Sequence, residues 1–236
     1  MKNPHSDSFL ARALRSGVLA LGIAAAIFTN LARAATGSDN VGNYTEGWAT
    51  GTNGGSGFGA WTLEGNSYVG DPTNAGSNLS GMATGGNAFA LWADTPGLSK
   101  ASRSFAAPLV AGDQFSIQLG YVWDNGFRGL DLVGSNGTIF NFNIGGSGMT
   151  WNGGGSYPPI AWGGVRDSGV IVNLTFVRTL TGFLYQIQSP QDPSLNGSGV
   201  ISASDVTGFA VYVGDAGGGA AADMRFNNME LSTTAV

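Results

Sequence analysis

Cysteine is absent from the 236-residue chain, and the single histidine, His5, lies near its start. A chain without cysteine forms no disulfide and has no thiolate nucleophile. A Ser-His catalytic pair and a histidine-ligated zinc, copper or iron site both need a histidine inside the folded domain. If His5 is removed with an N-terminal leader, all these classes of site are excluded from the mature protein.

The N-terminus has the pattern of a secretory signal peptide. Basic residues precede an apolar run from Gly17 to Phe28, and Ala32 and Ala34 place small residues at the −3 and −1 positions of a cleavage site. The alternative, a membrane anchor, needs about 20 apolar residues, which is longer than this run. We therefore predict a signal peptide at residues 1–34 and a secreted mature chain at residues 35–236, without a later membrane-spanning helix.

Few basic residues remain once this leader is removed. The first 34 residues contain four of the ten basic residues and one of the fifteen acidic residues, so the mature chain has six basic and fourteen acidic residues and a net charge of −8. Such a chain repels the phosphates of nucleic acids and of anionic membrane surfaces. We therefore expect neither as a partner.

Glycine is abundant in the mature chain. It accounts for thirty-eight of the 202 residues, well above the roughly 7 per cent of average proteins. This proportion, with many Ser, Thr and Asn residues, is also found in disordered chains. Twenty-three aromatic residues and long alternating runs instead favour a folded β protein with glycine-rich turns. A length of about 200 residues suits a single all-β domain.

The segment from Gln114 to Ile144 has the clearest alternation in the chain. Apolar residues at every second position from Phe115 to Trp123 predict a half-buried strand. Asp124-Asn125-Gly126 and Ser135-Asn136-Gly137 supply the residues that tight turns prefer. We therefore predict three consecutively paired strands, a β-meander.

The other face of this predicted meander is polar. Asp131 lies between two leucines and therefore points away from the core, and Gln118, Asn141 and Asn143 follow the same alternation. These four side chains would line a polar surface. If that surface is concave and the predicted loop from Trp151 to Trp162 overhangs it, the meander becomes the floor of a binding groove; otherwise it is scaffold.

Further alternating runs bring the expected total to ten to twelve strands, with few or no helices. Strands at 87–93 and 102–105 are expected to pair, and strands at 170–179 and 183–188 to form a hairpin. The apolar phase shifts within the last run, which predicts a β-bulge at Asn227-Asn228. Two stacked antiparallel sheets, a jelly-roll β-sandwich, would hide the apolar face of each strand.

Several short stretches carry a resemblance to a known family. They are Asp39-Asn40, Asn43-Tyr44, Trp48, the glycine cluster from Asn53 to Trp61, Phe89–Trp92 and Arg225–Met229. This set, which spans nearly the whole mature chain, resembles bacterial secreted jelly-roll modules of concanavalin-A-like or carbohydrate-binding type. The resemblance implies a two-sheet β-sandwich, an architecture that serves lectins, hydrolases and structural modules. The Glu-x-Asp-x-x-Glu motif of laminarinase-type jelly rolls is absent.

Two groups of residues are candidates for sugar binding, which needs an aromatic face to stack on a sugar ring beside amide and carboxylate groups. One group lies between residues 145 and 164, which we predict to be a loop, and the other lies in the predicted meander. The alternative is that their rings cover the ends of the sandwich. The candidate ligand-binding residues are Trp151, Tyr157, Trp162, Trp123, Asp124, Arg128, Asp131 and Asn141.

Calcium is the one metal that this composition allows, because it prefers carboxylate, amide and backbone oxygens. A jelly roll often brings its first and last strands together, which would place Asp39 and Asn40 near Asp223 and Asn227. These four residues form a candidate calcium site. Turn formation is the alternative explanation for the same residues, since no calcium loop of fixed spacing is present.

A catalytic alternative has few groups to use. Hydrolysis of a glycoside needs two carboxylates roughly 5–9 Å apart, and the mature chain has only three glutamates, Glu46, Glu64 and Glu230, besides its aspartates. Asp131 with Asp124 across a groove is the pair to consider.

The sequence therefore favours a secreted, non-catalytic β-sandwich that binds a polysaccharide or cell-surface glycan, or that belongs to an extracellular matrix or surface layer. One alternative is a glycoside hydrolase or polysaccharide lyase that uses Asp and Glu alone. The other is a structural surface protein that self-associates through its strand edges.

Overall fold

The antiparallel β-sandwich predicted from the sequence is present. The computed structural model describes residues 36–145, 148–152, 168–203 and 205–233, and the predicted signal peptide lies outside these ranges. They contain fourteen strands, more than the predicted ten to twelve, and five short 3-10 helices. No helix within them is long and apolar enough to cross a membrane.

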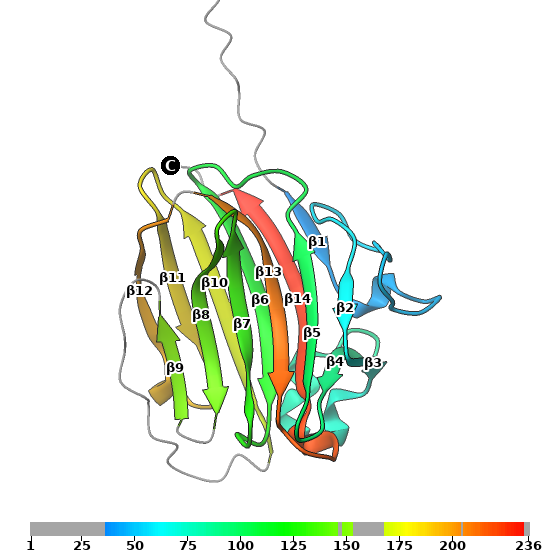
Figure 1. Cartoon of the computed structure of the whole chain (residues 1–236). Helices are drawn as coiled ribbons and strands as arrows, with labels where there is room; N and C mark the ends of the chain where they lie inside the picture. The colour runs from blue at the N-terminus through cyan, green and yellow to red at the C-terminus, as the bar shows by residue number, and fades with distance from the viewer. Residues whose placement is uncertain (1–35, 146–147, 153–167, 204, 234–236) are drawn as a thin grey trace, which may run out of the picture. The chain divides into compact units, whose positions relative to one another are not determined.

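The strands follow one another in the order shown in Figure 1. They are β1 (Gly37–Asp39), β2 (Thr62–Glu64), β3 (Asn66–Gly70), β4 (Ala88–Trp92), β5 (Leu98–Ser104), β6 (Asp113–Tyr121), β7 (Phe127–Gly134), β8 (Gly137–Gly145), β9 (Gly148–Asn152), β10 (Val170–Arg178), β11 (Phe183–Gln188), β12 (Gly197–Ile201), β13 (Val206–Gly214) and β14 (Met224–Thr233). The 3-10 helices are η1 (Val41–Asn43), η2 (Pro72–Asn74), η3 (Ser77–Met82), η4 (Pro193–Leu195) and η5 (Ala220–Ala222).

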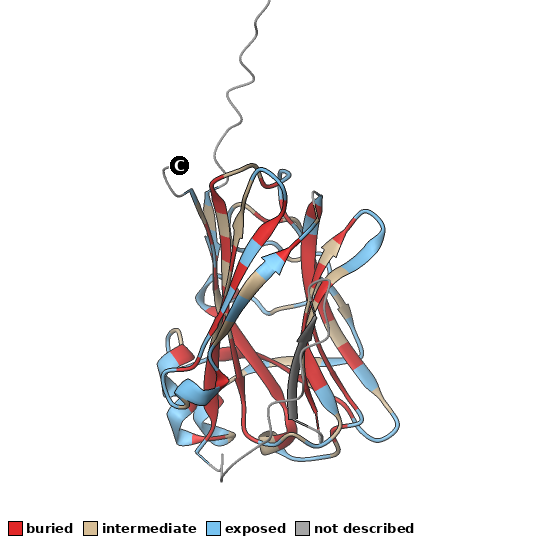
Figure 2. Cartoon of the chain, turned by 90° about the vertical axis from the view of Figure 1, so that its left-hand side faces the viewer, coloured by how far each residue is buried: buried red, intermediate tan, exposed pale blue. Residues whose placement is uncertain are grey.

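The strands form two sheets that face each other. The eight-stranded sheet has the order β12-β11-β10-β6-β14-β4-β3, with β1 also paired to β14, and the six-stranded sheet has the order β2-β5-β13-β7-β8-β9. Figure 2 shows the sheets from the side, with the buried residues on the surfaces that face each other. Helix η3 packs Leu79 and Met82 on the outer face of the eight-stranded sheet, against Ala88, Val122 and Ile171.

The predicted β-meander is wrong in its first pairing. Strands β7 and β8 form the expected hairpin, but β6 lies in the other sheet between β10 and β14. The segment 122–126 therefore crosses from one sheet to the other. The predicted pairing of 87–93 with 102–105 fails in the same way, because β4 pairs with β3 and β14 while β5 pairs with β2 and β13. Alternation determines which side chains are buried, but it does not determine which strands pair.

The core consists of the alternating residues that the sequence predicted to face inward. On β6, Phe115, Ile117, Leu119 and Tyr121 are buried, and β10 and β11 bury their predicted apolar faces in the same way. The ring of Phe115 lies 4.8 Å, centre to centre, from that of Phe209 in the opposite sheet. Large aromatic side chains thus span the space between the sheets, where dense packing makes each buried ring costly to remove.

A buried ion pair holds the N-terminal segment on the sandwich. Arg103 on β5 donates to the carboxylate of Asp39, which has no exposed surface. The Asp39 carboxylate also accepts a hydrogen bond of 2.5 Å from the Tyr44 hydroxyl. The guanidinium of Arg103 lies 5.0 Å from the ring centre of Phe58 and 4.8 Å from that of Trp61. The glycine-rich segment between residues 53 and 61 is therefore folded around one arginine.

Asp39→Asn tests this ion pair. The change keeps the shape of the side chain but leaves the charge of Arg103 buried without its counter-ion. Breaking a buried pair in this way costs about 3–5 kcal/mol, and we expect that loss in the free energy of unfolding measured with urea. Glu46→Gln, which neutralises an exposed carboxylate in the same segment, should change it by less than about 0.5 kcal/mol. Equal stabilities of Asp39→Asn and the wild-type protein would contradict the role assigned to the pair.

Candidate functional site

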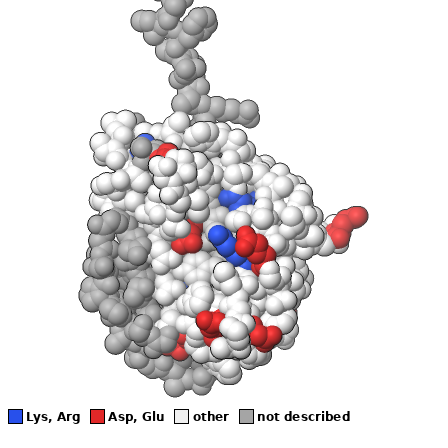
Figure 3. Space-filling model, in the orientation of Figure 1, with Lys and Arg blue, Asp and Glu red and all other residues white. Residues whose placement is uncertain are grey.

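The outer face of the six-stranded sheet carries two adjoining pockets that share Lys100. One has a volume of about 320 Å³ and the other of about 410 Å³. We refer to the two together as the groove. Figure 3 shows this face, which is largely uncharged, with acidic and basic groups gathered near its centre. The first pocket is lined by Leu98, Lys100, Phe127, Asp131, Asn141, Asn143 and Tyr212. The second is lined by Ala60, Thr62, Lys100, Ser102, Arg103, Ser104, Val133, Thr207, Gly208, Phe209 and Ala210.

The register of the sheet brings these side chains together from distant parts of the sequence. Tyr212 on β13 pairs with Lys100 on β5 and with Gly129 on β7, which in turn pairs with Asn143 on β8. Side chains at paired positions lie on the same face of a sheet and about 4.5–5.5 Å apart at Cβ. A row of outward-facing residues therefore crosses four strands.

Two aromatic rings in the groove lie over glycines. Phe127 pairs with Gly214, and Tyr212 pairs with Gly129, so β7 and β13 exchange an aromatic residue and a glycine twice. A Cβ atom at Gly214 would lie 2.1 Å from Cζ of Phe127, and one at Gly129 would lie 2.9 Å from the Tyr212 hydroxyl oxygen. Only glycine leaves room for the two rings against the sheet. Phe127 remains 37% exposed, whereas Tyr212 is 8% exposed.

Polar groups surround these rings and are joined by hydrogen bonds. Asn141 donates through Nδ2 to Asp131 and to the Tyr212 hydroxyl, both at 2.8 Å. The Tyr212 hydroxyl lies 3.1 Å from Oδ1 of Asn143, to which it donates. Burial raises the pKa of the Tyr212 hydroxyl above its ordinary value, so the hydroxyl stays protonated at neutral pH. The floor of the groove is therefore a connected set of hydrogen-bonding groups.

Asp131 and Asn141 are the two sequence-predicted ligand residues that the structure places in the groove. They are cross-strand partners on β7 and β8. Asn143, which was predicted to share their polar face, lines the same pocket. Gln118 does not, because it lies in the other sheet and bonds to Asn173 and Asn228.

Arg128 was wrongly predicted to bind ligand. It is fully buried and donates to the carbonyl oxygens of Ala222 at 2.8 Å and Asn125 at 2.6 Å. Burial lowers its pKa to about 10. The prediction failed because an apolar side chain usually points into the core and a charged one to solvent. On β7 the reverse holds: Phe127 points to solvent and Arg128 points between the sheets. Its hydrogen bonds join the connection before β7 to the connection before β14.

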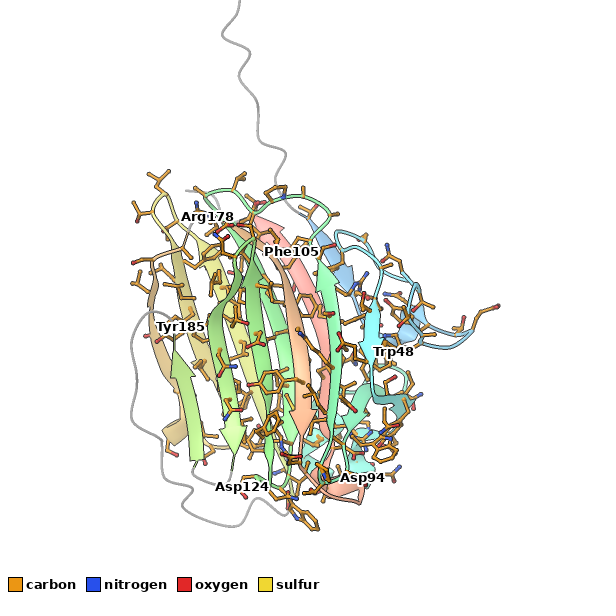
Figure 4. All side chains as sticks on the ribbon, viewed as in Figure 1. Trp48, Asp94, Phe105, Asp124, Arg178 and Tyr185 are labelled. Atoms are coloured by element: carbon orange, nitrogen blue, oxygen red, sulfur yellow. The ribbon has the colours of Figure 1, made fainter. Side chains whose placement is uncertain are left out.

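Trp123 and Asp124 lie on the crossing segment and do not line either pocket. The backbone amide of Trp123 donates to Ala221 at 3.1 Å. Figure 4 labels Asp124 at the lower end of the sandwich, where it precedes the first residue of β7. The predicted pairing of Asp124 with Asp131 across a groove is therefore not formed.

The predicted loop between residues 145 and 164 is partly a strand. β9 pairs with β8, and the backbone of Trp151 lies opposite Phe142. Met149 and Trp151 alternate with polar residues, a short signal that the flanking glycines obscure. The side chain of Trp151, and Tyr157 and Trp162 altogether, lie outside the described residues.

The four candidate calcium ligands are engaged in other bonds. β1 does pair with β14 as expected, but Asp39 is bound by Arg103. Asn40 accepts from the amide of Gly42, and Asn227 accepts from the amide of Val41, both at 2.9 Å. Among the described residues, no group of three or more Asp, Glu, His or Cys side chains could hold a metal ion. A cation at Asp39 would have to displace the guanidinium.

Asp223, the fourth of these residues, belongs to a separate cluster. It accepts hydrogen bonds from the Tyr68 hydroxyl and, at 3.2 Å, from Arg225. The guanidinium of Arg225 lies 4.9 Å from the centre of the Tyr68 ring. Burial raises the pKa of Asp223 and raises that of Tyr68 to about 12.

The predicted bulge at Asn227-Asn228 is confirmed by the register shift in β14 and by a positive φ of 51° at Asn228.

Comparison with known proteins finds only distant structural similarity. No protein-family model matches the chain, and no curated protein sequence is detectably similar to it. Similar solved structures include a sialidase (TM-score 0.45, 12% identity, 74% of this chain and 17% of the sialidase). They also include the CBM2 module of the Lactobacillus casei BL23 phage J-1 evolved Dit (0.43, 11%, 85% and 98%) and the Emp46p carbohydrate recognition domain in its metal-free form (0.42, 13%, 75% and 89%). At these identities and TM-scores the comparisons carry no argument about function, which must be argued from the groove itself.

Tyr68→Phe tests the cluster around Asp223. At pH 7 the loss of one partly buried hydrogen bond to a carboxylate should cost about 1.5–3 kcal/mol of unfolding free energy. Because folding raises the Tyr68 pKa from 10.0 to about 12, the wild-type protein loses stability as pH rises through this range. The gap between the two proteins in urea unfolding should therefore narrow above pH 10.0.

Val69→Ala, an exposed neighbour on β3, serves as the control, since its cost should not change with pH. A gap for Tyr68→Phe that stays constant up to the pKa of about 12 would contradict the assigned hydrogen bond.

Proposed function

We propose that this protein is a secreted, non-catalytic β-sandwich that binds a glycan in the groove. The observation that carries the proposal is the exposed ring of Phe127, held over Gly214 beside Asp131, Asn141 and Lys100. A sugar ring has an apolar face that stacks on an aromatic ring and a rim of hydroxyl groups that need hydrogen-bond partners. The groove offers both within one small pocket, the combination that ligand sites commonly use.

Secretion is supported by the N-terminal pattern of basic residues, an apolar run and small residues before position 35. Glycans are abundant outside cells, so an exported protein with such a groove would meet this class of ligand. The absence of histidine and cysteine after the leader narrows the catalytic options to carboxylates.

The arrangement of carboxylates in the groove favours binding over hydrolysis. Asp131 on β7 lines the groove and Glu64 on β2 is the cross-strand partner of Lys100, and three strand-to-strand steps separate β2 from β7. At about 4.8 Å a step, their backbones are roughly 14 Å apart. Glycoside hydrolases hold their two carboxyl groups roughly 5–9.5 Å apart. This spacing supports the non-catalytic proposal.

Phe127→Ala is the direct test. Loss of the exposed ring should weaken glycan binding about tenfold or more, because the stacking surface is removed. Binding is measured by pull-down on insoluble polysaccharides and by affinity gel electrophoresis with soluble ones, with and without EDTA. If EDTA abolishes retention, binding requires a calcium ion. Reducing sugar or unsaturated ends released in the same tubes would favour a hydrolase or a lyase.

A second test variant and two control variants accompany this change. Trp123→Ala removes an aromatic side chain that is 47% exposed but lies outside the groove, and it should bind like the wild-type protein. Gly214→Ala places a methyl group 2.1 Å from Cζ of Phe127, so the ring must move and binding should fall as in Phe127→Ala. Gly218→Ala meets no atom within 4 Å and should have no effect. Unchanged binding in both Phe127→Ala and Gly214→Ala would refute the site.

Self-association is a second candidate, favoured by the edge strand β12. Among the described residues nothing pairs with its outer edge, and residues 197–201 contain neither a charge nor a proline. Val200, which is 59% exposed, lies opposite Leu184, which is 48% exposed. Natural proteins commonly protect such edges with charges, prolines or bulges. An unprotected apolar edge suits a second copy of the chain.

Val200→Lys is expected to abolish this association. Sedimentation velocity should show a dimer that forms as the protein concentration rises, and the lysine should leave only monomer because it introduces a charge into the edge contact. Val69→Lys, the same change on β3 at the opposite edge of the sheet, is the matched control and should not alter the dimer. A wild-type protein that is monomeric at every concentration would exclude the edge contact.

A further inference from the structure

The charges around the groove indicate which class of glycan it accepts. This inference rests on the proposed function, because it concerns the selectivity of the same groove. Three of the five basic residues that the structure describes, Arg103, Arg128 and Arg225, are buried. They are engaged by Asp39, by backbone carbonyl oxygens and by Asp223, respectively. None of the three offers a guanidinium to the groove.

Arg178, at the end of β10 in the eight-stranded sheet, is also engaged in a structural role. It donates to the carbonyl oxygen of Gly182 at 2.8 Å, and its guanidinium lies 5.2 Å from the ring centre of Phe183. Within the described ranges, Lys100 is therefore the single basic side chain that lines the groove and is free of such a structural role.

Carboxylates offset the charge of Lys100. Glu64 is its cross-strand partner on β2 and is exposed, while Asp131 lines the same pocket two strands away on β7. A ligand that fills this pocket contacts Lys100 and Asp131 directly, and Glu64 lies beside Lys100, within the Debye length of about 8 Å at physiological ionic strength. Both carboxylates therefore act on such a ligand, and the local balance is two negative charges to one positive.

This balance disfavours a glycan that carries a carboxylate or sulfate on each sugar. Proteins that recognise such anions commonly use the two-pronged donors of arginine, which hold both oxygens of an anion. Of the four arginines that the structure describes, three are inside the sandwich and Arg178 lines neither pocket. A like charge placed beside Asp131 and Glu64 therefore costs binding energy that no arginine offsets among these residues. Hydroxyl groups meet no such penalty, because they both donate to Asp131 and accept from Lys100 or from the side-chain amides.

The shape of the groove indicates a chain rather than a single sugar. The two pockets meet at Lys100 and together extend across β8, β7, β13, β5 and β2. Each pocket is already within the size range of about 300–1,000 Å³ that holds a small ligand. Its floor between the aromatic end and β2 consists of small residues such as Ser102, Gly208 and Ala210, which leave room for a continuous ligand.

We infer that the groove binds an internal stretch of an uncharged, extended polysaccharide and discriminates against polyuronates and sulfated polysaccharides. Phe127 stacks on one sugar, Asp131 and Asn141 bond its hydroxyl groups, and Lys100 contacts the next sugar along the chain. The low basic content of the described surface and the net charge of −8 predicted for the mature chain reinforce this selectivity at long range.

Matched polymers test the inference. Affinity gel electrophoresis compares neutral polysaccharides (hydroxyethyl cellulose, mixed-linkage glucan, galactomannan, dextran) with charged ones (carboxymethyl cellulose, alginate, polygalacturonate, dextran sulfate). The runs are made at about 10 mM and about 1 M salt, where the Debye lengths are roughly 30 and 3 Å. We expect at least one neutral polymer to be retained at both salt concentrations. Its charged counterpart should bind at least about tenfold more weakly at low salt.

Glu64→Gln separates charge from contact, since Glu64 does not line either pocket. It should leave binding of the neutral polymer unchanged and strengthen binding of the charged counterpart at low salt only. Lys100→Met should weaken the neutral ligand several-fold and should not create charged-polymer binding.

Three results would overturn the inference. Tighter binding of a charged polymer than of its neutral counterpart, lost in Lys100→Met, would show that the groove selects anions. If Glu64→Gln bound the charged polymer as weakly as the wild-type protein at low salt, the selectivity would not come from the carboxylates. Retention of no polymer of either class would refute glycan binding itself, which distinguishes the failure of the proposed function from the failure of its selectivity.

Discussion

The register of β13 against β7 is the constraint on which both the core and the groove depend. On its inner face β13 buries Phe209, Val211 and Val213. On its outer face the same register sets Tyr212 opposite Gly129 and Gly214 opposite Phe127. A slip of one residue would exchange the two faces of the strand. It would bring a tyrosine into the core and set each aromatic ring against a residue with a side chain, so folding energy and site geometry are fixed by the same pairing.

Buried arginines have a second consequence beyond stability. Arg103 gathers Asp39, Tyr44 and two aromatic rings into a unit that ties the N-terminal segment to β5. Arg128 performs a similar task at the lower end by bonding two connections. Each of these groups stabilises the fold only while its partner is present, because an unpaired buried charge is costly. By holding its positive charge inside, the protein presents a surface that is mostly neutral or acidic.

Much of the fold can be predicted from the sequence because alternation reports burial directly. The inward faces of β6, β10 and β11 and the bulge at Asn227-Asn228 all follow from a pattern of period two and its interruption. Strand partners do not follow in the same way. The segment 122–126 is short enough for a hairpin, yet it crosses between sheets. Both edges of β6 are already paired, one with β10 and the other with β14, so β7 pairs in the other sheet.

The site was predictable only where its residues lie close in sequence. Asp131, Asn141 and Asn143 belong to one hairpin, so their shared face follows from alternation along β7 and β8. Lys100 and Tyr212 come from strands more than a hundred residues apart in the chain, and only the register of β5 with β13 brings them together. Phe127 was not among the predicted ligand residues and Arg128 was, because a phenylalanine normally points inward and an arginine outward. A glycine opposite the phenylalanine, visible only after pairing is known, is what reverses them.

The groove thus joins a fixed aromatic end to a flexible basic centre, and the two differ in what they contribute to binding. Phe127 is confined by Gly214 beneath it and by Tyr212, whose ring centre is 6.1 Å away. Little rotational freedom is left for a ligand to restrict, so stacking on this ring is preorganised and adds to affinity. Lys100 is half-exposed on a long side chain, and fixing such a side chain costs up to about 2 kcal/mol. Its hydrogen bonds therefore add only a several-fold gain in affinity, less than stacking on Phe127, while Glu64 and Asp131 determine which ligands are rejected.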